Sequence, residues 1–136
     1  MNKTQIGDYS EQLFILYCLK NEIPVCKPIG NNLPYDFIIE VKDKLLKIQV
    51  KTAYHNNSSP EFTYTFNTRS CSKNYSEVIS SDYVGKIDYF AVVNQNLDKP
   101  ICFVPIEKAA KGCMTIYYGD NPKPQQNDYK TFLSLK

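Results

Sequence analysis

Two short polar motifs at the two ends of a predicted β-hairpin constrain the fold of this chain most strongly. Residues 35–41 and 45–51 are rich in β-branched and other apolar residues, which is typical of strands. The polar segment Lys42-Asp43-Lys44 between them is short enough to be a hairpin turn. Pro34-Tyr35-Asp36 opens this hairpin and Gln49-Val50-Lys51 closes it. The sequence therefore predicts a carboxylate, an amide and a lysine on neighbouring strands.

The parity of the hairpin decides whether these side chains meet. Because side chains alternate along a strand, Asp36 occupies one face of the first strand, and Gln49 and Lys51 share one face of the second. An even loop such as Asp43-Lys44 predicts that Asp36 lies directly across from Lys51 and diagonal to Gln49. An odd loop would place Asp36 on the opposite face. The cluster therefore depends on register.

These motifs and their neighbours resemble the PD-(D/E)-X-K nuclease superfamily. The similarity extends over residues 5–54 through Gly7-Asp8-Tyr9-Ser10-Glu11, Pro28-Ile29-Gly30 and the segment around Lys51. The chain departs from the usual pattern because Pro34 stands one place early and Gln49 replaces an acid. With glutamine at that position, the chain is similar to the branch that includes a cyanobacterial group I intron homing endonuclease.

The order of predicted elements is helix, strand, hairpin, helix and strand, which favours an α/β fold. We expect a central mixed β-sheet flanked by helices, and the resemblance implies a restriction-endonuclease-like core. A length of 136 residues suits one domain. We assign residues 1–119 to a nuclease domain and residues 120–136 to a linker and C-terminal tail.

Three further segments outside the hairpin have a predicted structure. A helix is expected from Asp8 or Ser10 to about Lys20, ended by Asn21, and its later half is apolar nearly all round and should be buried. Residues 61–69 alternate as a half-buried strand. Residues 70–81 are rich in serine and are expected to form a loop with a short helix.

The resemblance implies a metal-dependent catalytic site at the hairpin. Mg²⁺ prefers oxygen ligands, so we expect it to be held by Asp36, the Gln49 amide oxygen or the Val50 carbonyl, and Glu11, with Mn²⁺ as a substitute. Lys51 matches the family lysine that orients or deprotonates water and neutralises charge on the transition state. The predicted catalytic residues are Glu11, Asp36, Gln49 and Lys51.

Each of these residues also has a simpler interpretation. Glu11 precedes Phe14 and Ile15 by one helical turn and leans toward the buried side, although a solvated acid in a first helical turn is the alternative. Asp36 alone is typical of an acid near a turn, and Lys51 alone is typical of a surface lysine. Their combination with Gln49 and the motif spacing favours the nuclease interpretation.

Double-stranded DNA is the expected partner, since the net charge of +2 permits nucleic-acid binding without requiring it. Arg69 is the single arginine and can form a fork onto guanine. The alternative for the hairpin lysines and the 61–69 strand is an ordinary solvated surface. The candidate DNA-binding residues are Lys42, Lys44, Lys47, Asn56, Asn57, Thr63, Thr65, Asn67 and Arg69.

Several function classes are excluded or disfavoured by composition. His55 is the only histidine, which excludes histidine-cluster nucleases, and the chain contains no phosphate-binding G-x-x-x-x-G-K-S/T motif. Five cysteines form no C-x-x-C pair and are expected to be buried small hydrophobic residues in a reducing compartment. No apolar run approaches the ~18 residues of a membrane span. Without a secretory signal, a cytoplasmic location is expected.

The leading hypothesis is a Mg²⁺-dependent, sequence-specific double-strand DNA endonuclease, most similar to an intron-encoded homing enzyme. Two alternatives remain: a Holliday-junction-type resolvase, and a non-catalytic DNA-binding module with a decayed site. Cutting both strands symmetrically requires two sites related by a two-fold axis, so we expect at least a homodimer and favour a homotetramer. Phe132, Leu133 and Leu135 in the tail either dock on a neighbouring subunit or fold back on their own sheet.

Overall fold

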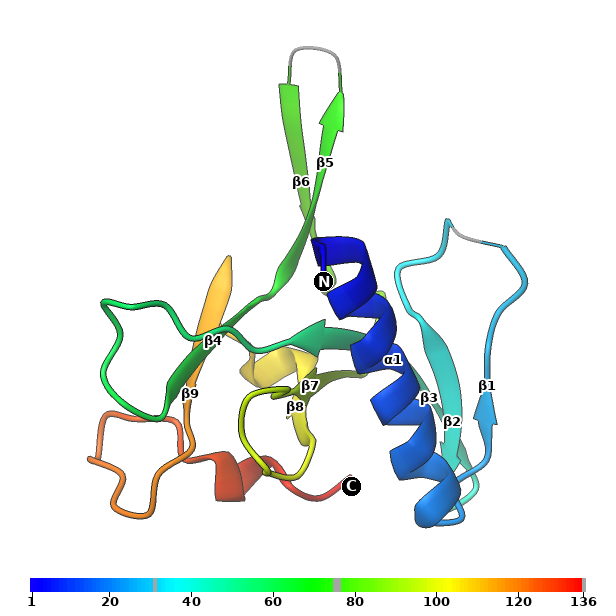
Figure 1. The fold of residues 1–136 in the computed structure, drawn as a ribbon. Coiled ribbons are helices and arrows are strands. Elements are labelled where there is room, and N and C mark those ends of the chain that lie inside the picture. Colours follow the sequence, from blue (N-terminus) through cyan, green and yellow to red (C-terminus); the bar gives the residue numbers. More distant parts are fainter. Residues whose placement is uncertain (31, 75–76, 136) are drawn as a thin grey trace.

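A mixed five-stranded sheet forms the centre of the protein, as predicted (Figure 1). The computed structural model describes residues 1–30, 32–74 and 77–135, with the side chains of all of these except residues 70–81. β3 and β7 run parallel, and the other neighbouring strands are antiparallel. In spatial order, the sheet consists of β1 (Val25–Cys26), β2 (Phe37–Val41), β3 (Lys44–Thr52), β7 (Tyr89–Val93) and β8 (Cys102–Pro105).

The interior strand β7 is buried along its whole length. A strand that is apolar on both sides must be covered on both faces of its sheet. α1 (Lys3–Lys20) covers one face, and the ring centroids of Phe14 on α1 and Phe37 on β2 are 5.3 Å apart.

The opposite face is covered by a second, two-stranded sheet of β4 (Thr63–Asn67) and β9 (Cys113–Tyr117). The rings of Phe66 on β4 and Phe90 on β7 pack edge to face with centroids 5.6 Å apart. The prediction of helices flanking the sheet is therefore wrong on this side. Within the described ranges the chain forms one α-helix and the short 3-10 helices η1 (Ile106–Lys108) and η2 (Tyr129–Phe132). Alternating strands with one apolar face cover a sheet as well as a helix does.

α1 begins earlier than the predicted start at Asp8 or Ser10. Its N-cap is Asn2, whose side-chain oxygen accepts from the Gln5 backbone amide at 2.9 Å, while the Gln5 side chain accepts from the Asn2 amide at 2.9 Å. This reciprocal pair satisfies two backbone donors that would otherwise lack partners and fixes the helix start. The end at Asn21 is as predicted, with the Asn21 side chain donating to the Tyr17 carbonyl.

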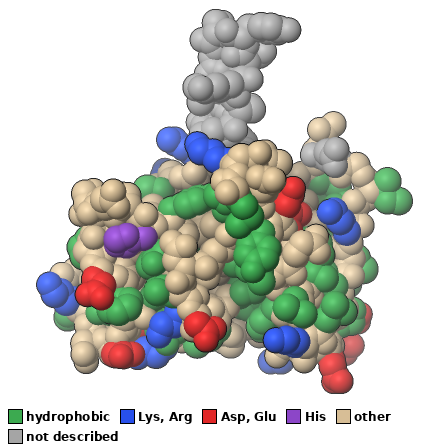
Figure 2. Space-filling model, in the orientation of Figure 1, with side chains coloured by type: hydrophobic (Ala, Val, Ile, Leu, Met, Phe, Trp, Pro, Cys, Tyr) green, Lys and Arg blue, Asp and Glu red, His purple; other side chains and the backbone are tan. Residues whose placement is uncertain are grey.

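The later half of α1 is not buried all round. Leu16 and Leu19 are 47% and 66% exposed, because a helix lying on a sheet buries only one stripe of its surface. Hydrophobic side chains are accordingly visible on the face of the molecule that carries α1 (Figure 2). No helix in the described ranges has the length and apolar character that a bilayer crossing requires.

Residues 69–74 and 77–82 form two antiparallel strands instead of the predicted loop with a short helix. β5 (Arg69–Asn74) pairs with β6 (Glu77–Asp82), with Arg69 opposite Asp82. Serine-rich segments have low intrinsic strand preference, so the pairing of the two backbones, rather than local composition, establishes these strands.

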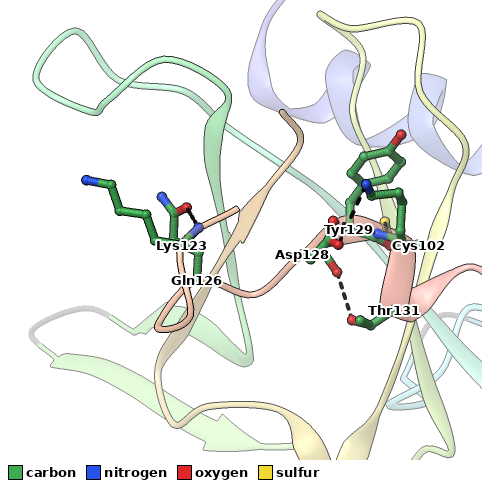
Figure 3. Close-up of polar contacts among 7 residues, drawn as sticks. Cys102, Lys123, Gln126, Asp128, Tyr129 and Thr131 are labelled. Carbon is green, nitrogen blue, oxygen red and sulfur yellow. Dashed lines mark hydrogen bonds and ion pairs between the residues drawn. The ribbon is translucent and has the colours of Figure 1, made fainter. Parts of the chain in front are cut away.

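The segment after β9 packs against its own chain. The Asn127 carbonyl accepts from the Tyr117 amide and the Asn127 side chain donates to the Thr115 carbonyl, both at 2.8 Å. At the start of η2, the Thr131 hydroxyl donates to the Asp128 carbonyl at 2.7 Å (Figure 3). These bonds attach the predicted linker to the edge of β9.

The tail continues this packing. Tyr129, Phe132 and Leu133 are half-buried against the core between the two sheets, and Leu135 contacts the core under α1. Within one chain, this arrangement corresponds to the alternative in which the tail folds back on its own sheet. A role of the tail between subunits stays a prediction.

The cysteines do not all behave as buried hydrophobic residues. Cys18 and Cys102 are buried, but Cys26 and Cys113 are exposed on short edge strands. The prediction is therefore wrong for these two positions, and Cys71 lies outside the residues with described side chains.

Candidate active site

The β2–β3 hairpin has an even loop, but the loop is Lys42-Asp43 rather than Asp43-Lys44. Val41 pairs with Lys44, and both loop residues have positive φ angles of 51° and 63°, as a type I′ hairpin turn requires. Continuing the pairing of Phe37 with Ile48 by one residue sets Asp36 opposite Gln49. The prediction that Lys51 lies directly across is therefore wrong by two residues, and Lys51 is diagonal. The even parity keeps all three side chains on one face.

Asp36 is fixed to β3 by its backbone and by its side chain. Its amide donates to the Ile48 carbonyl at 2.8 Å, and its Oδ2 accepts from the Val50 amide at 2.8 Å. These two bonds bracket Gln49. Both partners of Asp36 on β3 are backbone groups. Because backbone groups have no rotamers, they hold the carboxylate in one position.

Asp36 lies at the junction of two hollows in the surface. A cavity of about 540 Å³ is lined by Asn32, Leu33, Pro34, Asp36, Gln49, Asp82, Tyr83 and Lys86. A second cavity of about 250 Å³ is lined by Asp8, Glu11, Lys27, Pro28, Gly30, Leu33, Tyr35 and Asp36. The carboxylate of Asp36 is thus accessible from the Gln49 side and from the helix side.

Glu11 reaches this junction because α1 is anchored one residue earlier. The fully buried Ser10 hydroxyl lies 2.6 Å from the Thr52 hydroxyl at the end of β3, and it accepts from the Gln95 side chain at 2.7 Å. α1 is thereby docked over the end of β3, and Glu11 lies in the third helical turn. A solvated first-turn acid, the simpler interpretation, does not describe this position.

Both carboxylates are less acidic than usual. Burial raises the pKa of Glu11, and the negative charge of Asp36 raises it further, whereas Lys27 lowers it. Burial also raises the pKa of Asp36, although the Val50 amide, Lys51 and Lys27 all act in the opposite direction. Two half-buried carboxylates that resist ionisation form a site that a cation would stabilise.

The oxygen donors present fit Mg²⁺. Two carboxylates and the amide oxygen of Gln49 are the hard ligands that this ion takes, and it usually retains several waters. In the described part of the chain, no three His, Cys, Asp or Glu side chains lie close enough to hold a metal by themselves. Gln49 or the Val50 carbonyl could add a neutral oxygen to the two carboxylates.

Lys51 is held by a residue that the motif does not contain. Its Nζ donates to the Tyr83 hydroxyl at 3.3 Å and lies 5.0 Å from the centroid of the Tyr83 ring. Tyr83 is buried, and its ring packs edge to face on Phe90 with centroids 5.4 Å apart. The ammonium group is consequently directed by a rigid aromatic side chain.

Three site residues were missed by the sequence interpretation: Tyr83, Lys27 and Lys86. Tyr83 and Lys86 lie in segments far from the hairpin, and no local spacing relates them to Asp36. The available signal for Lys27 was its place beside Pro28-Ile29-Gly30, a segment that already matched the family pattern.

The predicted DNA-binding lysines are spread along the hairpin. Lys42 and Lys44 are exposed at the turn, at the opposite end of the hairpin from Asp36. Lys47 is exposed on the same face of β3 as Gln49, with its Nζ 5.7 Å from the Tyr35 ring centroid.

The other predicted DNA-binding residues lie in the 55–60 loop and on β4 and β5. Asn56 uses its side-chain oxygen to accept from Ser58 and Ser59 within the loop. The Thr65 hydroxyl pairs with that of Thr115 at 3.0 Å, and the Thr63 hydroxyl oxygen is buried. Asn57, Asn67 and Arg69 are exposed. The structure does not bring the loop and β4 residues into the two hollows around Asp36.

Comparison with known proteins identifies the family and the fold. A model of the PD-(D/E)XK endonuclease family matches residues 1–132. Among solved structures, the chain is similar to a bacterial homing endonuclease, I-Ssp6803I, with a TM-score of 0.76 and 24% sequence identity over 96% of this chain and 88% of that chain. No curated protein matches the sequence. The similarity to I-Ssp6803I confirms the restriction-endonuclease-like core, and the family match confirms the resemblance seen in the motifs. The chain belongs to the PD-(D/E)XK endonuclease family.

Proposed function

We propose that this protein is a Mg²⁺-dependent, sequence-specific endonuclease of double-stranded DNA. The observation that carries the proposal is the meeting of Glu11, Asp36 and Gln49 around two adjoining hollows, in a chain of an endonuclease family. Lys51 adjoins them, since it lowers the pKa of Asp36 and bonds to Tyr83, which lines the Gln49 cavity.

Asp36 and Glu11 would supply the anionic ligands of the metal, and Gln49 or the Val50 carbonyl a neutral one. When bound, Mg²⁺ polarises the phosphodiester and lowers the pKa of a coordinated water. The Val50 amide donates to Oδ2 of Asp36 and so orients the carboxylate, which would leave the other carboxylate oxygen available to a metal. With Gln49 in place of an acid, the ligand set carries one negative charge fewer, so a weaker metal affinity is expected.

Lys51 contributes a positively charged ammonium group to the hydrolysis. In hydrolysis the water oxygen forms a bond to phosphorus, one P–O ester bond breaks, and the leaving oxygen takes up a proton. Lys51, directed by Tyr83, orients the attacking water or neutralises the negative charge that develops on the phosphate. Its fixed position matters because such stabilisation depends on preorganised donors.

A homing role is the specific form of this proposal. It is supported by the glutamine at position 49, which the chain shares with the homing branch of the family, and by the structural similarity to a bacterial homing endonuclease. A homing enzyme acts at a defined sequence, so cleavage should give discrete products.

The test is cleavage of a plasmid that carries the intron-free form of the host locus, with Mg²⁺, with Mn²⁺ and with EDTA. Discrete linear product with either metal, absent with EDTA and with Asp36→Asn, is expected. Preferential cutting of four-way junctions over linear duplex would replace the proposal with a resolvase. Binding to the locus without metal-dependent cleavage would indicate a non-catalytic DNA-binding module.

We also propose that the active form is at least a homodimer, with a homotetramer favoured. One domain carries one site, and two antiparallel strands require two sites related by a two-fold axis. We assign the nuclease site to residues 1–119 and propose residues 120–136 as a subunit contact, because Phe132, Leu133 and Leu135 remain only half-buried within one chain. Sedimentation of the DNA-free protein tests this, and a monomer at micromolar concentration would refute it.

A further inference from the structure

A third hollow continues the active-site surface beyond Tyr83. This cavity of about 300 Å³ lies between the base of the β5–β6 hairpin and the turn that joins η1 to β9, and it contains the side chains of Arg69 and Lys111. It shares Asp82 and Tyr83 with the cavity that contains Asp36 and Gln49. A path therefore runs along the surface from the catalytic carboxylate, past Tyr83, to a pair of cations.

The far wall of this cavity is held in place by hydrogen bonds. The buried Thr68 donates from its hydroxyl to the Ala110 carbonyl at 2.6 Å and from its amide to the Gly112 carbonyl at 3.0 Å. The Cys113 amide donates to the Lys111 carbonyl at 2.9 Å. The 109–112 turn is thus fixed to the junction of β4 and β5, so the cavity exists before any ligand arrives.

Arg69 is directed toward this turn. Its guanidinium carbon lies 4.0 Å from the position that a Cβ atom would occupy on Gly112, whose φ is +79°. A glycine suits this position because the backbone is left-handed. Arg69 and Lys111 consequently face one cavity from two separate segments.

The charge of the cavity suits an anion that is part of a larger ligand. Two cations and one carboxylate, Asp82, line it, which leaves a single excess positive charge. Asp82 accepts from the Val84 amide at 3.3 Å and lies opposite Arg69 in the hairpin register. Such a site would hold a free anion weakly, whereas a phosphodiester already held at Asp36 and Lys51 would reach it at high effective concentration.

We propose that this cavity binds a backbone phosphate of the DNA strand that flanks the cleavage position, with Arg69 and Lys111 as its ligands. The inference rests on the proposed function, since it takes DNA as the substrate of the neighbouring site. It assigns Arg69 to the phosphate backbone rather than to the edge of a guanine. Contacts of this kind position the duplex and carry no sequence information.

The experiment measures the salt dependence of binding to a labelled duplex of random sequence, with EDTA present to prevent cleavage. Each phosphate contact that is lost lowers the slope of log K against log salt by about 0.9. Because both residues hold the same phosphate, the double variant Arg69→Ala/Lys111→Ala is expected to reduce the slope by about 0.9, and each single variant by part of that amount. Lys123→Ala, which removes an exposed lysine from the tail loop, is the charge-matched control and should leave the slope unchanged.

Arg69→Lys separates the two roles of this arginine. Lysine keeps the charge but cannot form a bidentate fork, so a phosphate ligand should retain the slope and the cleavage pattern. Unchanged slopes in both alanine variants would overturn the inference, as would an Arg69→Lys variant that keeps the slope but cuts at altered sequences. Because Arg69 and Lys111 are exposed, the thermal transitions of the variants should match the wild type and exclude misfolding.

Wild-type cleavage in Mg²⁺ is measured alongside. If the wild type does not cut DNA, the proposed function fails whatever the slopes are. If the wild type cuts DNA and the salt slopes of Arg69→Ala and Lys111→Ala are unchanged, only the phosphate site is refuted.

Discussion

Lys51 and Tyr83 are separated by 32 residues in the chain, yet the lysine Nζ lies 3.3 Å from the tyrosine hydroxyl and 5.0 Å from the centre of its ring. The lysine comes from β3 and the tyrosine follows β6, so the two meet only in the folded protein. The contact makes Tyr83 a positioning residue for the proposed catalytic lysine.

Tyr83→Phe removes the hydroxyl and keeps the ring. A hydrogen bond to a charged group contributes about 1.5–3 kcal/mol, so the cleavage rate should fall by about tenfold or more while DNA binding is retained. The pH dependence of the rate should also change, which a purely structural role would not cause. Tyr64→Phe, at a buried tyrosine in the same core, is the control. Equal pH profiles for Tyr83→Phe and wild type would remove Tyr83 from the mechanism.

Asp36→Asn and Lys51→Ala should abolish cleavage without loss of DNA binding. Asparagine keeps an oxygen for the Val50 amide, so the hairpin end is preserved while the ligand charge is lost. We expect each rate to fall below about a thousandth of the wild type, as when electrostatic stabilisation is removed from other enzymes. A gel assay of cleavage and a binding assay in EDTA give the two readouts. More than a tenth of the wild-type rate in either variant would count against the assigned role.

Glu11→Gln should stabilise the metal-free protein near neutral pH. The pKa of Glu11 is raised above its ordinary value of 4.5, chiefly by burial and then by Asp36, so the folded state binds its proton more tightly than the unfolded state. The resulting penalty on folding is fully present above the raised pKa, shrinks as the pH falls through it, and is absent below the unfolded value. The Tm of Glu11→Gln should therefore exceed that of the wild type at pH 7.5, and the difference should vanish near pH 4.

Bound Mg²⁺ should make the wild type, rather than Glu11→Gln, the more stable of the two proteins. Mg²⁺ stabilises only the protein that can hold it, so it should raise the Tm of the wild type more than that of Glu11→Gln. Thermal scans with Mg²⁺ and with EDTA at both pH values give all the required comparisons. A larger Mg²⁺ effect on Glu11→Gln than on the wild type would exclude Glu11 as a ligand.

Gln49 variants test the neutral ligand. Gln49→Glu adds a carboxylate opposite Asp36 and should lower the Mg²⁺ concentration needed for half-maximal cleavage, if activity is retained. Gln49→Leu keeps a similar volume, removes the oxygen and should be severely impaired. Titration of the cleavage rate with Mg²⁺ compares the three proteins. An unchanged metal requirement in Gln49→Leu would assign Gln49 to the scaffold.

Truncation after Asp120 should destabilise the chain itself. It removes Tyr129, which stacks on the buried Tyr118 with ring centroids 5.5 Å apart, and the half-buried Phe132 and Leu133. Loss of these apolar contacts predicts a clear fall in Tm, since large buried side chains contribute about 1.5–3 kcal/mol each. Leu135→Ser is the milder variant with which to test subunit contact by sedimentation. An unaltered Tm after truncation would show that the tail packing contributes little.

The hairpin and the shared face of its polar side chains were determined by the sequence alone. Alternation of apolar and polar residues and a polar turn are local properties, so they identify two strands and their parity without any knowledge of the rest of the chain. The register was not determined in the same way. A shift by two residues still places buried positions such as Phe37 and Ile39 opposite buried positions on β3, so the pattern permits both loops.

The tertiary structure decided the remaining parts of the site. Helix caps at Asn2 and the Ser10 anchor set where Glu11 lies, and the packing of Tyr83 on Phe90 sets where Lys51 points. The covering of the second sheet face by β4 and β9, and the cavity around Arg69 and Lys111, likewise depend on segments that are distant in sequence. Contacts of this kind have no local periodicity. They are selected by the burial of apolar surface and the pairing of backbone groups over the whole chain.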